Sequence, residues 1–143
     1  MNINLKDIVS VSKGLKLLYV EDNKEVREQT VKMLDNFFDD ITEAVDGEDG
    51  LTKYKEANGT YDLSISDINM PHLDGVDMSR EILSIDPKQL IIIITAFNEK
   101  EQIARLDEIE IVDYLHKPVE FKQFIEILGK AIKSYEEFYK EVA

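Results

Sequence analysis

The fold is decided by the stretch Leu63-Ser64-Ile65-Ser66-Asp67-Ile68-Asn69-Met70-Pro71-His72-Leu73-Asp74-Gly75. Residues 61–66 have the length and the branched apolar residues of a short strand, and Pro71 and Gly75 prevent that strand from continuing. Asp67 therefore stands where a strand ends. In an open α/β sheet, ligands gather at the carboxyl ends of the strands. We expect this carboxylate to face a binding site and not a core.

Outward from this stretch, short apolar runs alternate with segments of helical periodicity. Strands are predicted at 15–20, 41–45, 61–66, 89–95 and 109–115. Helices are predicted at 23–38, 48–57, from just after Gly75 to 85, 99–107 and 119–141, with Asn23 and Asn98 as N-caps. This alternation predicts an α/β fold, a doubly wound five-stranded parallel sheet with helices on both faces. Residues 1–14 show no sustained period and are interpreted as a leader, with room for a short helical turn.

The composition indicates one acidic domain. The chain has 143 residues, of which 43% are hydrophobic, which is enough for one substantial core. Its net charge of -13 argues against a nucleic-acid or anionic-membrane partner and favours cations or basic protein faces. The absence of cysteine excludes disulfides and thiolate chemistry. The longest apolar run, Leu90 to Ile94, is far short of the roughly 20 residues that span a bilayer. We expect a soluble, cytoplasmic chain.

Three acids stand at predicted strand ends: Glu21 and Asp22 after the first strand, and Asp67 after the third. If these strands are neighbours, the carboxylates share one pocket, and their repulsion calls for protonation, a basic side chain or a cation. Magnesium is the natural ion, because it prefers oxygen ligands and keeps waters that a phosphoryl oxygen can replace. Taken singly, each acid is better explained as a helix cap or a turn residue.

Thr95 and Lys117 end the fourth and fifth predicted strands, so four strand ends on one side carry chemically active side chains. Together they suit phosphoryl transfer to a carboxylate. Asp67 would attack phosphorus as the nucleophile, while Lys117 and Thr95 would contact phosphoryl oxygens. Lys117 alone would be read as a surface lysine in a turn. His72 and His116 are assigned no role.

These residues resemble the receiver domain of two-component response regulators, the family to which bacterial chemotaxis regulators belong. The matching pieces are Leu17 to Asn23, Asp46-Gly47, Asp62 to Gly75, Ile94-Thr95-Ala96 and Tyr114 to Pro118. Five motifs in this order and spacing are specific. The resemblance covers roughly residues 15–135, which we take as the domain, with 136–143 as a helix end or the start of a linker. It implies a flavodoxin-like (βα)5 fold with strand order 2-1-3-4-5.

The resemblance implies a role for each matching residue. Asp67 is the phosphoacceptor for a phosphohistidine on a histidine kinase or a histidine phosphotransfer protein. Magnesium, with manganese as an alternative, is bound by Glu21, Asp22, Asp67 and the backbone carbonyl of Asn69. The phosphoryl group is contacted by Thr95, Ala96 and Lys117, and the switch pair is Thr95 and Tyr114.

Three departures from the family pattern stand out. Ser64 and Ser66 place hydroxyls in a strand that is usually more apolar, which predicts looser packing, and Gly50 replaces a common alanine, which weakens its helix. Phe97 stands where the family tunes dephosphorylation, as does Asn69. We hypothesise that Phe97 obstructs water and lengthens the phosphorylated lifetime, although a packing role explains it equally well.

The leading interpretation is a phosphorylation-activated signalling switch that is not an enzyme beyond self-catalysed phosphotransfer and autodephosphorylation. Its output would be a protein partner that binds the surface of helix 99–107, strand 109–115 and helix 119–141, and the chain would be a monomer or a phosphorylation-dependent dimer. Alternatives are the receiver portion of a longer multidomain regulator or hybrid kinase, a receiver-like module that is never phosphorylated, and a magnesium-dependent aspartyl-phosphate phosphatase. The phosphatase usually needs a second acid where Asn69 stands.

Overall fold

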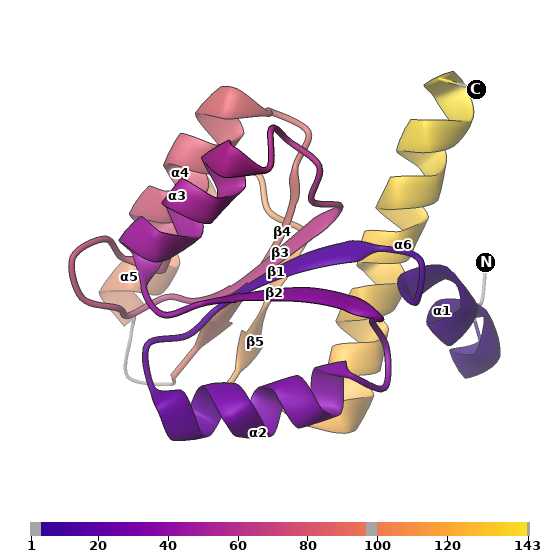
Figure 1. Ribbon diagram of the computed structural model, residues 1–143, viewed down its shortest axis with the longest axis horizontal. Helices are drawn as coiled ribbons and strands as arrows, with labels where there is room; N and C mark the ends of the chain where they lie inside the picture. The colour runs from indigo at the N-terminus through magenta and orange to yellow at the C-terminus, as the bar shows by residue number, and fades with distance from the viewer. Residues whose placement is uncertain (1–3, 97–99, 143) are drawn as a thin grey trace.

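The computed structural model describes residues 4–96 and 100–142 and contains one five-stranded parallel sheet (Figure 1). The strands are β1 (Lys16–Val20), β2 (Asp40–Ala44), β3 (Leu63–Asp67), β4 (Leu90–Thr95) and β5 (Asp113–His116). Their order is β2-β1-β3-β4-β5, which confirms the predicted flavodoxin-like topology. Because all the strands are parallel, their carboxyl ends meet at one edge of the sheet.

Helices cover both faces of this sheet. They are α1 (Leu5–Ser12), α2 (Lys24–Leu34), α3 (Gly47–Glu56), α4 (Gly75–Ile85), α5 (Lys100–Arg105), a 3-10 turn η1 (Leu106–Glu108) and α6 (Phe121–Val142). Figure 1 shows α1, α2 and α6 on one side and α3, α4 and α5 on the other. Among the described residues, no helix is both long and apolar enough to cross a membrane.

The alternation of side chains along each strand fills two cores. Leu17 and Tyr19 of β1 point into the core beneath α2 and α6, whereas Leu18 and Val20 point into the core beneath α3 and α4. Burial on both faces explains why the strands read as nearly continuous apolar runs. Ser64 and Ser66 are also fully buried, and the Ser66 hydroxyl donates to the Asp67 carbonyl oxygen at 2.7 Å.

Several element boundaries differ from the prediction. The helix predicted at 23–38 ends at Leu34, because the chain turns there to bury Phe37 and Phe38. The strand predicted at 109–115 begins only at Asp113, and the helix predicted at 99–107 becomes α5 followed by η1. The predicted N-cap Asn98 lies outside the described residues. Asp67 is the last residue of β3, whereas the predicted strand ends at residue 66.

The segment interpreted as a leader contains an eight-residue helix, α1, so the described chain has six α-helices where five were predicted. Ile8 is buried in the core on the α6 side, and a methyl group on Gly129 of α6 would lie in ordinary contact with it at 3.7 Å. The Ser12 hydroxyl donates to the Phe37 carbonyl oxygen at 2.5 Å. This segment therefore packs as part of the folded body.

Removing the Ile8 side chain tests this packing. We expect Ile8→Ala to lower the free energy of unfolding by about 2–4 kcal/mol, because it leaves a cavity against α6. Leu5→Ala in the same helix is the matched control, since Leu5 is 46% exposed, and it should change stability by less than about 0.5 kcal/mol. Urea unfolding measures both. Equal midpoints for the two variants would contradict the packing of α1.

Candidate functional site

Three carboxylates meet at the carboxyl edge of the sheet. Glu21 and Asp22 follow β1, and Asp67 ends β3, the neighbouring strand. One ligand oxygen from each lies within 4.8 Å of the others. Glu21 and Asp67 are buried, with 1% and 4% of their surface exposed, whereas Asp22 is exposed. The arrangement predicted from the strand ends is therefore present.

Lys117 joins this cluster from the end of β5. Its ammonium donates to Asp67 Oδ2 at 2.7 Å and to Glu21 Oε1 at 3.3 Å. Its amide donates to the Thr95 carbonyl oxygen at 2.8 Å, which fixes the turn beside β4. Burial alone would lower the pKa of Lys117, but the hydrogen bond and the charge of Asp67 outweigh burial and raise it. The paired carboxylates therefore favour the charged form of Lys117.

The cluster still carries more negative charge than Lys117 neutralises. Burial, and then the neighbouring charge of Asp67, raise the pKa of the Glu21 carboxyl well above its ordinary value. Asp67 Oδ1 is buried and has no hydrogen-bond partner among the residues that the structure describes. An unpaired buried carboxylate oxygen beside two further carboxylates fits a hard divalent cation, which binds oxygen ligands.

The loop after Asp67 is held against the cluster by backbone contacts. The Gly75 amide donates to the Ile68 carbonyl oxygen at 2.8 Å, and the Asp74 side chain caps α4 by accepting from the Asp77 amide at 2.8 Å. A Cβ on Gly75 would collide with the Asp67 carbonyl oxygen. Asn69 is exposed in this loop, two residues after Asp67. Glycine therefore allows α4 to begin directly beside the acid.

Thr95 and Tyr114 lie on the adjacent strands β4 and β5, and their role as a switch pair stays a prediction. Thr95 is completely buried, and its hydroxyl donates to the Ala96 carbonyl oxygen at 3.2 Å. Tyr114 is half-buried, and its ring meets the edge of the His116 ring with centroids 5.5 Å apart. Phe97 lies outside the described residues, so its predicted role stays a prediction.

Sequence reasoning missed Arg27. Its guanidinium donates to the Glu21 carbonyl oxygen at 2.8 Å and lies 3.8 Å from Glu43 Oε1. The side chain thus ties α2 to the strand end that carries the acids. The sequence did offer a signal for this contact. Arg27 lies near the start of a helix that begins just after two acids.

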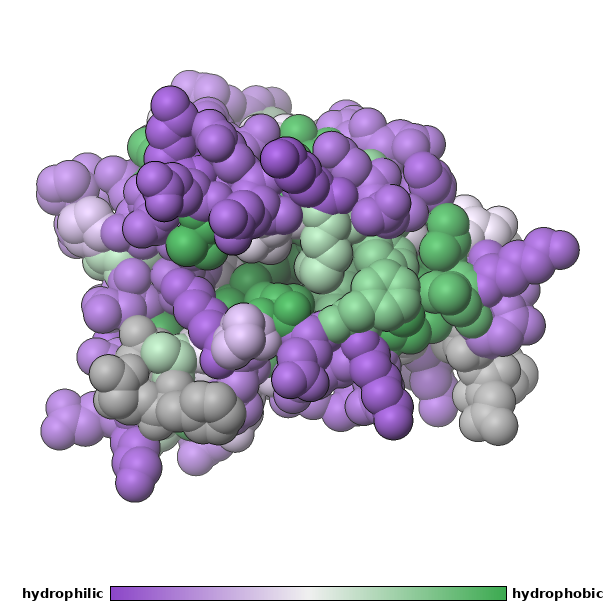
Figure 2. Space-filling model, turned by 90° about the horizontal axis from the view of Figure 1, so that it is seen from below, coloured by the Kyte–Doolittle hydropathy of each residue, from purple (hydrophilic) through white to green (hydrophobic). Residues whose placement is uncertain are grey.

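An apolar hollow of about 480 Å3 opens beside Lys117. Figure 2, which views the side where α2 and the start of α6 lie, shows hydrophobic side chains inside a hollow with more hydrophilic borders. The hollow is lined by Tyr19, Glu21, Val26, Gln29, Thr30, Met33, Ile94, Lys117, Pro118 and Val119. Two residues of the acidic site, Glu21 and Lys117, thus also line an apolar surface.

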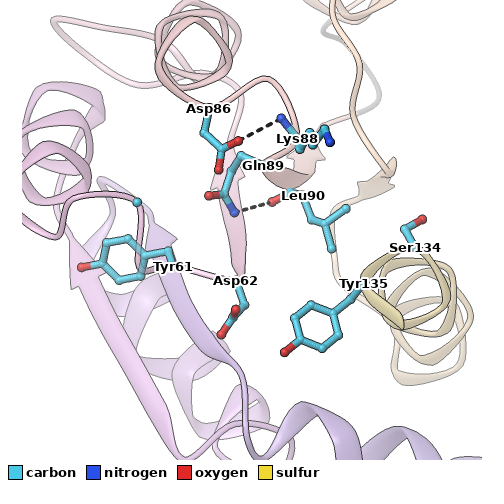
Figure 3. A pocket seen from close by; sticks show the side chains of 9 residues that line it. Tyr61, Asp62, Asp86, Lys88, Gln89, Leu90, Ser134 and Tyr135 are labelled. Atoms are coloured by element: carbon cyan, nitrogen blue, oxygen red, sulfur yellow. Dashed lines mark hydrogen bonds between the residues drawn. The ribbon is translucent and has the colours of Figure 1, made fainter. Parts of the chain in front are cut away.

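A second hollow, of about 210 Å3, lies at the amino ends of β3 and β4 (Figure 3). Its polar groups are largely satisfied: the Gln89 amide donates to the Leu90 carbonyl oxygen at 3.3 Å and accepts from the Tyr54 hydroxyl at 2.8 Å. Because a strand rises about 3.3 Å per residue, the five residues from Asp62 to Asp67 place this hollow roughly 16 Å from the acids. It is not part of the site.

Comparisons with known proteins agree with this geometry. A family model described as "Response regulator receiver domain" matches residues 17–129. The chain is 30% identical over 119 residues to the chemotaxis protein CheY of Treponema pallidum, covering 82% of this chain and 83% of that protein. It is 34% identical over 89 residues to the transcriptional regulatory protein ZraR of Salmonella typhimurium, covering 62% of this chain but 20% of that protein. A receiver domain structure from Clostridium thermocellum superposes with a TM-score of 0.76 at 28% identity, covering 87% of this chain and 98% of that one.

Alanine substitutions at Gly75 and Gly129 test the close approach of Gly75 to the Asp67 backbone. We expect Gly75→Ala to destabilise the chain by about 1–3 kcal/mol, because the new methyl group meets the fixed backbone of β3. Gly129→Ala in α6 has ordinary space around it and should stabilise by up to about 1 kcal/mol through helix propensity. Urea unfolding of both variants gives the comparison. A Gly75→Ala protein as stable as the parent would show that the loop is not held against Asp67.

Proposed function

We propose, because this chain belongs to the response regulator receiver domain family, that it is a phosphorylation-activated switch of a two-component phosphorelay. Asp67 accepts the phosphoryl group from the phosphohistidine of a histidine kinase or a histidine phosphotransfer protein. The proposal rests on the contacts of the two Asp67 carboxylate oxygens. One of its oxygens is bonded to Lys117, and the other is buried without a partner among the described residues, beside two further acids.

In the transfer, an Asp67 carboxylate oxygen forms a bond to phosphorus while the bond from phosphorus to the histidine nitrogen breaks. The electron pair of that bond stays on the donor's imidazole, which leaves as a neutral ring once it is protonated. Lys117 is held 2.7 Å from Asp67 Oδ2, so its charge is in place before a phosphoryl oxygen arrives. Thr95 and Ala96 supply a hydroxyl and a backbone amide to the other phosphoryl oxygens.

Glu21, Asp22, Asp67 and the carbonyl of Asn69 would hold the magnesium, with manganese as an alternative. The ion supplies charge neutralisation for the phosphoryl oxygens. Asn69 and Phe97 tune the dephosphorylation rate in this proposal. Asn69 stands where a phosphatase usually needs a second acid, which favours self-catalysed phosphotransfer and autodephosphorylation over activity on other substrates.

A downstream protein binds the face formed by α5, β5 and α6 and in this way receives the signal. Two hollows, of about 360 and 260 Å3, lie on this face, and both are lined by Asp113 and Tyr114. A change in Tyr114 would therefore reshape both hollows at once. Phosphorylation biases a two-state equilibrium of this face, in a monomer or by forming a dimer.

The phosphodonor approaches over the apolar hollow between α2 and α6. That hollow is lined by Glu21 and Lys117, so a partner seated in it lies beside the phosphoacceptor. Its apolar lining suits a protein surface better than a free ion.

A second arrangement is that the chain is the receiver portion of a longer regulator or hybrid kinase. It is supported by the similarity to ZraR, of which this chain covers only 20%. The chemistry proposed for Asp67 is the same in either arrangement.

The proposal is tested by incubation with acetyl phosphate and Mg2+, followed by intact-mass measurement and peptide mapping. We expect one added phosphoryl group on Asp67 and none in Asp67→Asn. Asp62→Asn is the control, because it removes an acid just before the same strand and far from the cluster. Unmodified wild type, or equal modification of Asp67→Asn, would overturn the proposal.

A further inference from the structure

Arg105, the last residue of α5, bridges two helices. Its Nη1 lies 2.7 Å from Asp74 Oδ2, and its Nη2 lies 2.5 Å from Asp77 Oδ1. These contacts raise the pKa of the Arg105 guanidinium, chiefly through the hydrogen bond to Asp74. About a third of the Arg105 side chain and a quarter of the Asp74 side chain are exposed, so the pair is partly shielded from water. Water screens it less than a fully exposed surface ion pair.

The bridge matters because α5 has few other attachments. None of the six residues of α5 is buried, and the next buried side chain is Leu106 in η1. A helix without a buried face is held by its ends and by specific polar contacts. The Arg105 ion pairs therefore hold α5 in place together with Leu106.

The other end of the bridge is fixed beside the phosphoacceptor. Asp74 caps α4, and the next residue, Gly75, is bonded to the Ile68 carbonyl oxygen and packed against the carbonyl of Asp67. Direct contacts therefore connect the backbone at Asp67 and Ile68 to Asp74. The Asp74 carboxylate in turn contacts Arg105.

From Arg105 the contacts continue to the output face. Ile103 of α5, Leu106 and Tyr114 line the same hollow of about 360 Å3. Arg105 thus lies between the loop that follows Asp67 and the helix that borders Tyr114. No other guanidinium among the described residues is paired with Asp74.

We propose that Arg105 is a positioning residue that couples the phosphoacceptor loop to α5, so that a change at Asp67 is transmitted to the Tyr114 face through Asp74. The inference rests on the proposed function, because it concerns how that switch sends its signal. The contacts through Asp74 and Arg105 form a second route from Asp67 to the Tyr114 face, beside the route through Thr95. Coupling of this kind changes affinities typically by about 5- to 150-fold.

The test compares variants in the response to Mg2+ with beryllofluoride, a phosphoryl mimic, followed by amide and tyrosine-ring NMR shifts. Arg105→Gln removes the bridge. Asp74→Asn removes the charge while keeping a good helix cap, which guards against a simple folding defect. Arg80→Gln is the matched control, because Arg80 pairs with Asp77 and Glu108 but not with Asp74.

In wild type and Arg80→Gln, we expect shifts both near Asp67 and at Tyr114. In Arg105→Gln and Asp74→Asn, the shifts near Asp67 should persist, while those at Tyr114 fall to less than half of the wild-type size. The double variant should be no worse than Arg105→Gln, because removing the guanidinium already breaks its contact with Asp74. Arg105→Lys should be intermediate, since lysine reaches one carboxylate at a time.

Wild-type shifts at Tyr114 that persist fully in Arg105→Gln would overturn this inference alone. Equal losses in Arg80→Gln would also overturn it, because the effect would then belong to the general charge of the helix pair. A wild type without any change near Asp67 would overturn the proposed function, and the inference with it.

Discussion

The candidate site depends on how the partly buried ammonium of Lys117 is shared between two buried carboxylates. Lys117 contacts both Glu21 and Asp67, and an oxygen of Asp22 lies within 4.8 Å of an oxygen of each of these two acids. One cation against three acids leaves negative charge in a poorly solvated place, which burial makes costly. The remaining charge and the unpaired Asp67 oxygen define a site that a divalent ion and a phosphoryl group can complete. The proposed reactivity is a consequence of this imbalance.

The parallel topology brings Lys117 and the acids together. Asp67 and Lys117 are fifty residues apart, yet parallel strands bring both to one edge of the sheet. The close approach of Gly75 lets α4 begin there, and Asp74 at its cap carries the connection on to Arg105. The acids, the loop after Asp67 and α5 are thus joined by a series of short contacts.

Local patterns in the sequence predicted the strands, the acids at their ends and the residues Thr95 and Lys117, because burial on both faces and abrupt polar endings leave clear signals. The strand order came from the family resemblance, since periodicity says nothing about which strands are neighbours. Arg27, Arg105 and the packing of α1 were not predicted. Ion pairs between distant elements leave no periodic trace, and α1 is recognisable only once Ile8 is seen against α6.

The most direct measurement of the charge imbalance is the free energy of unfolding in urea as Mg2+ is titrated, with KCl used to match ionic strength. If the acids bind the ion in the folded state, wild type should gain about 2.7 kcal/mol at a Mg2+ concentration a hundredfold above Kd. Glu21→Gln should gain clearly less. The same unfolding midpoints in MgCl2 and KCl would contradict the account, because the cluster would then need no cation.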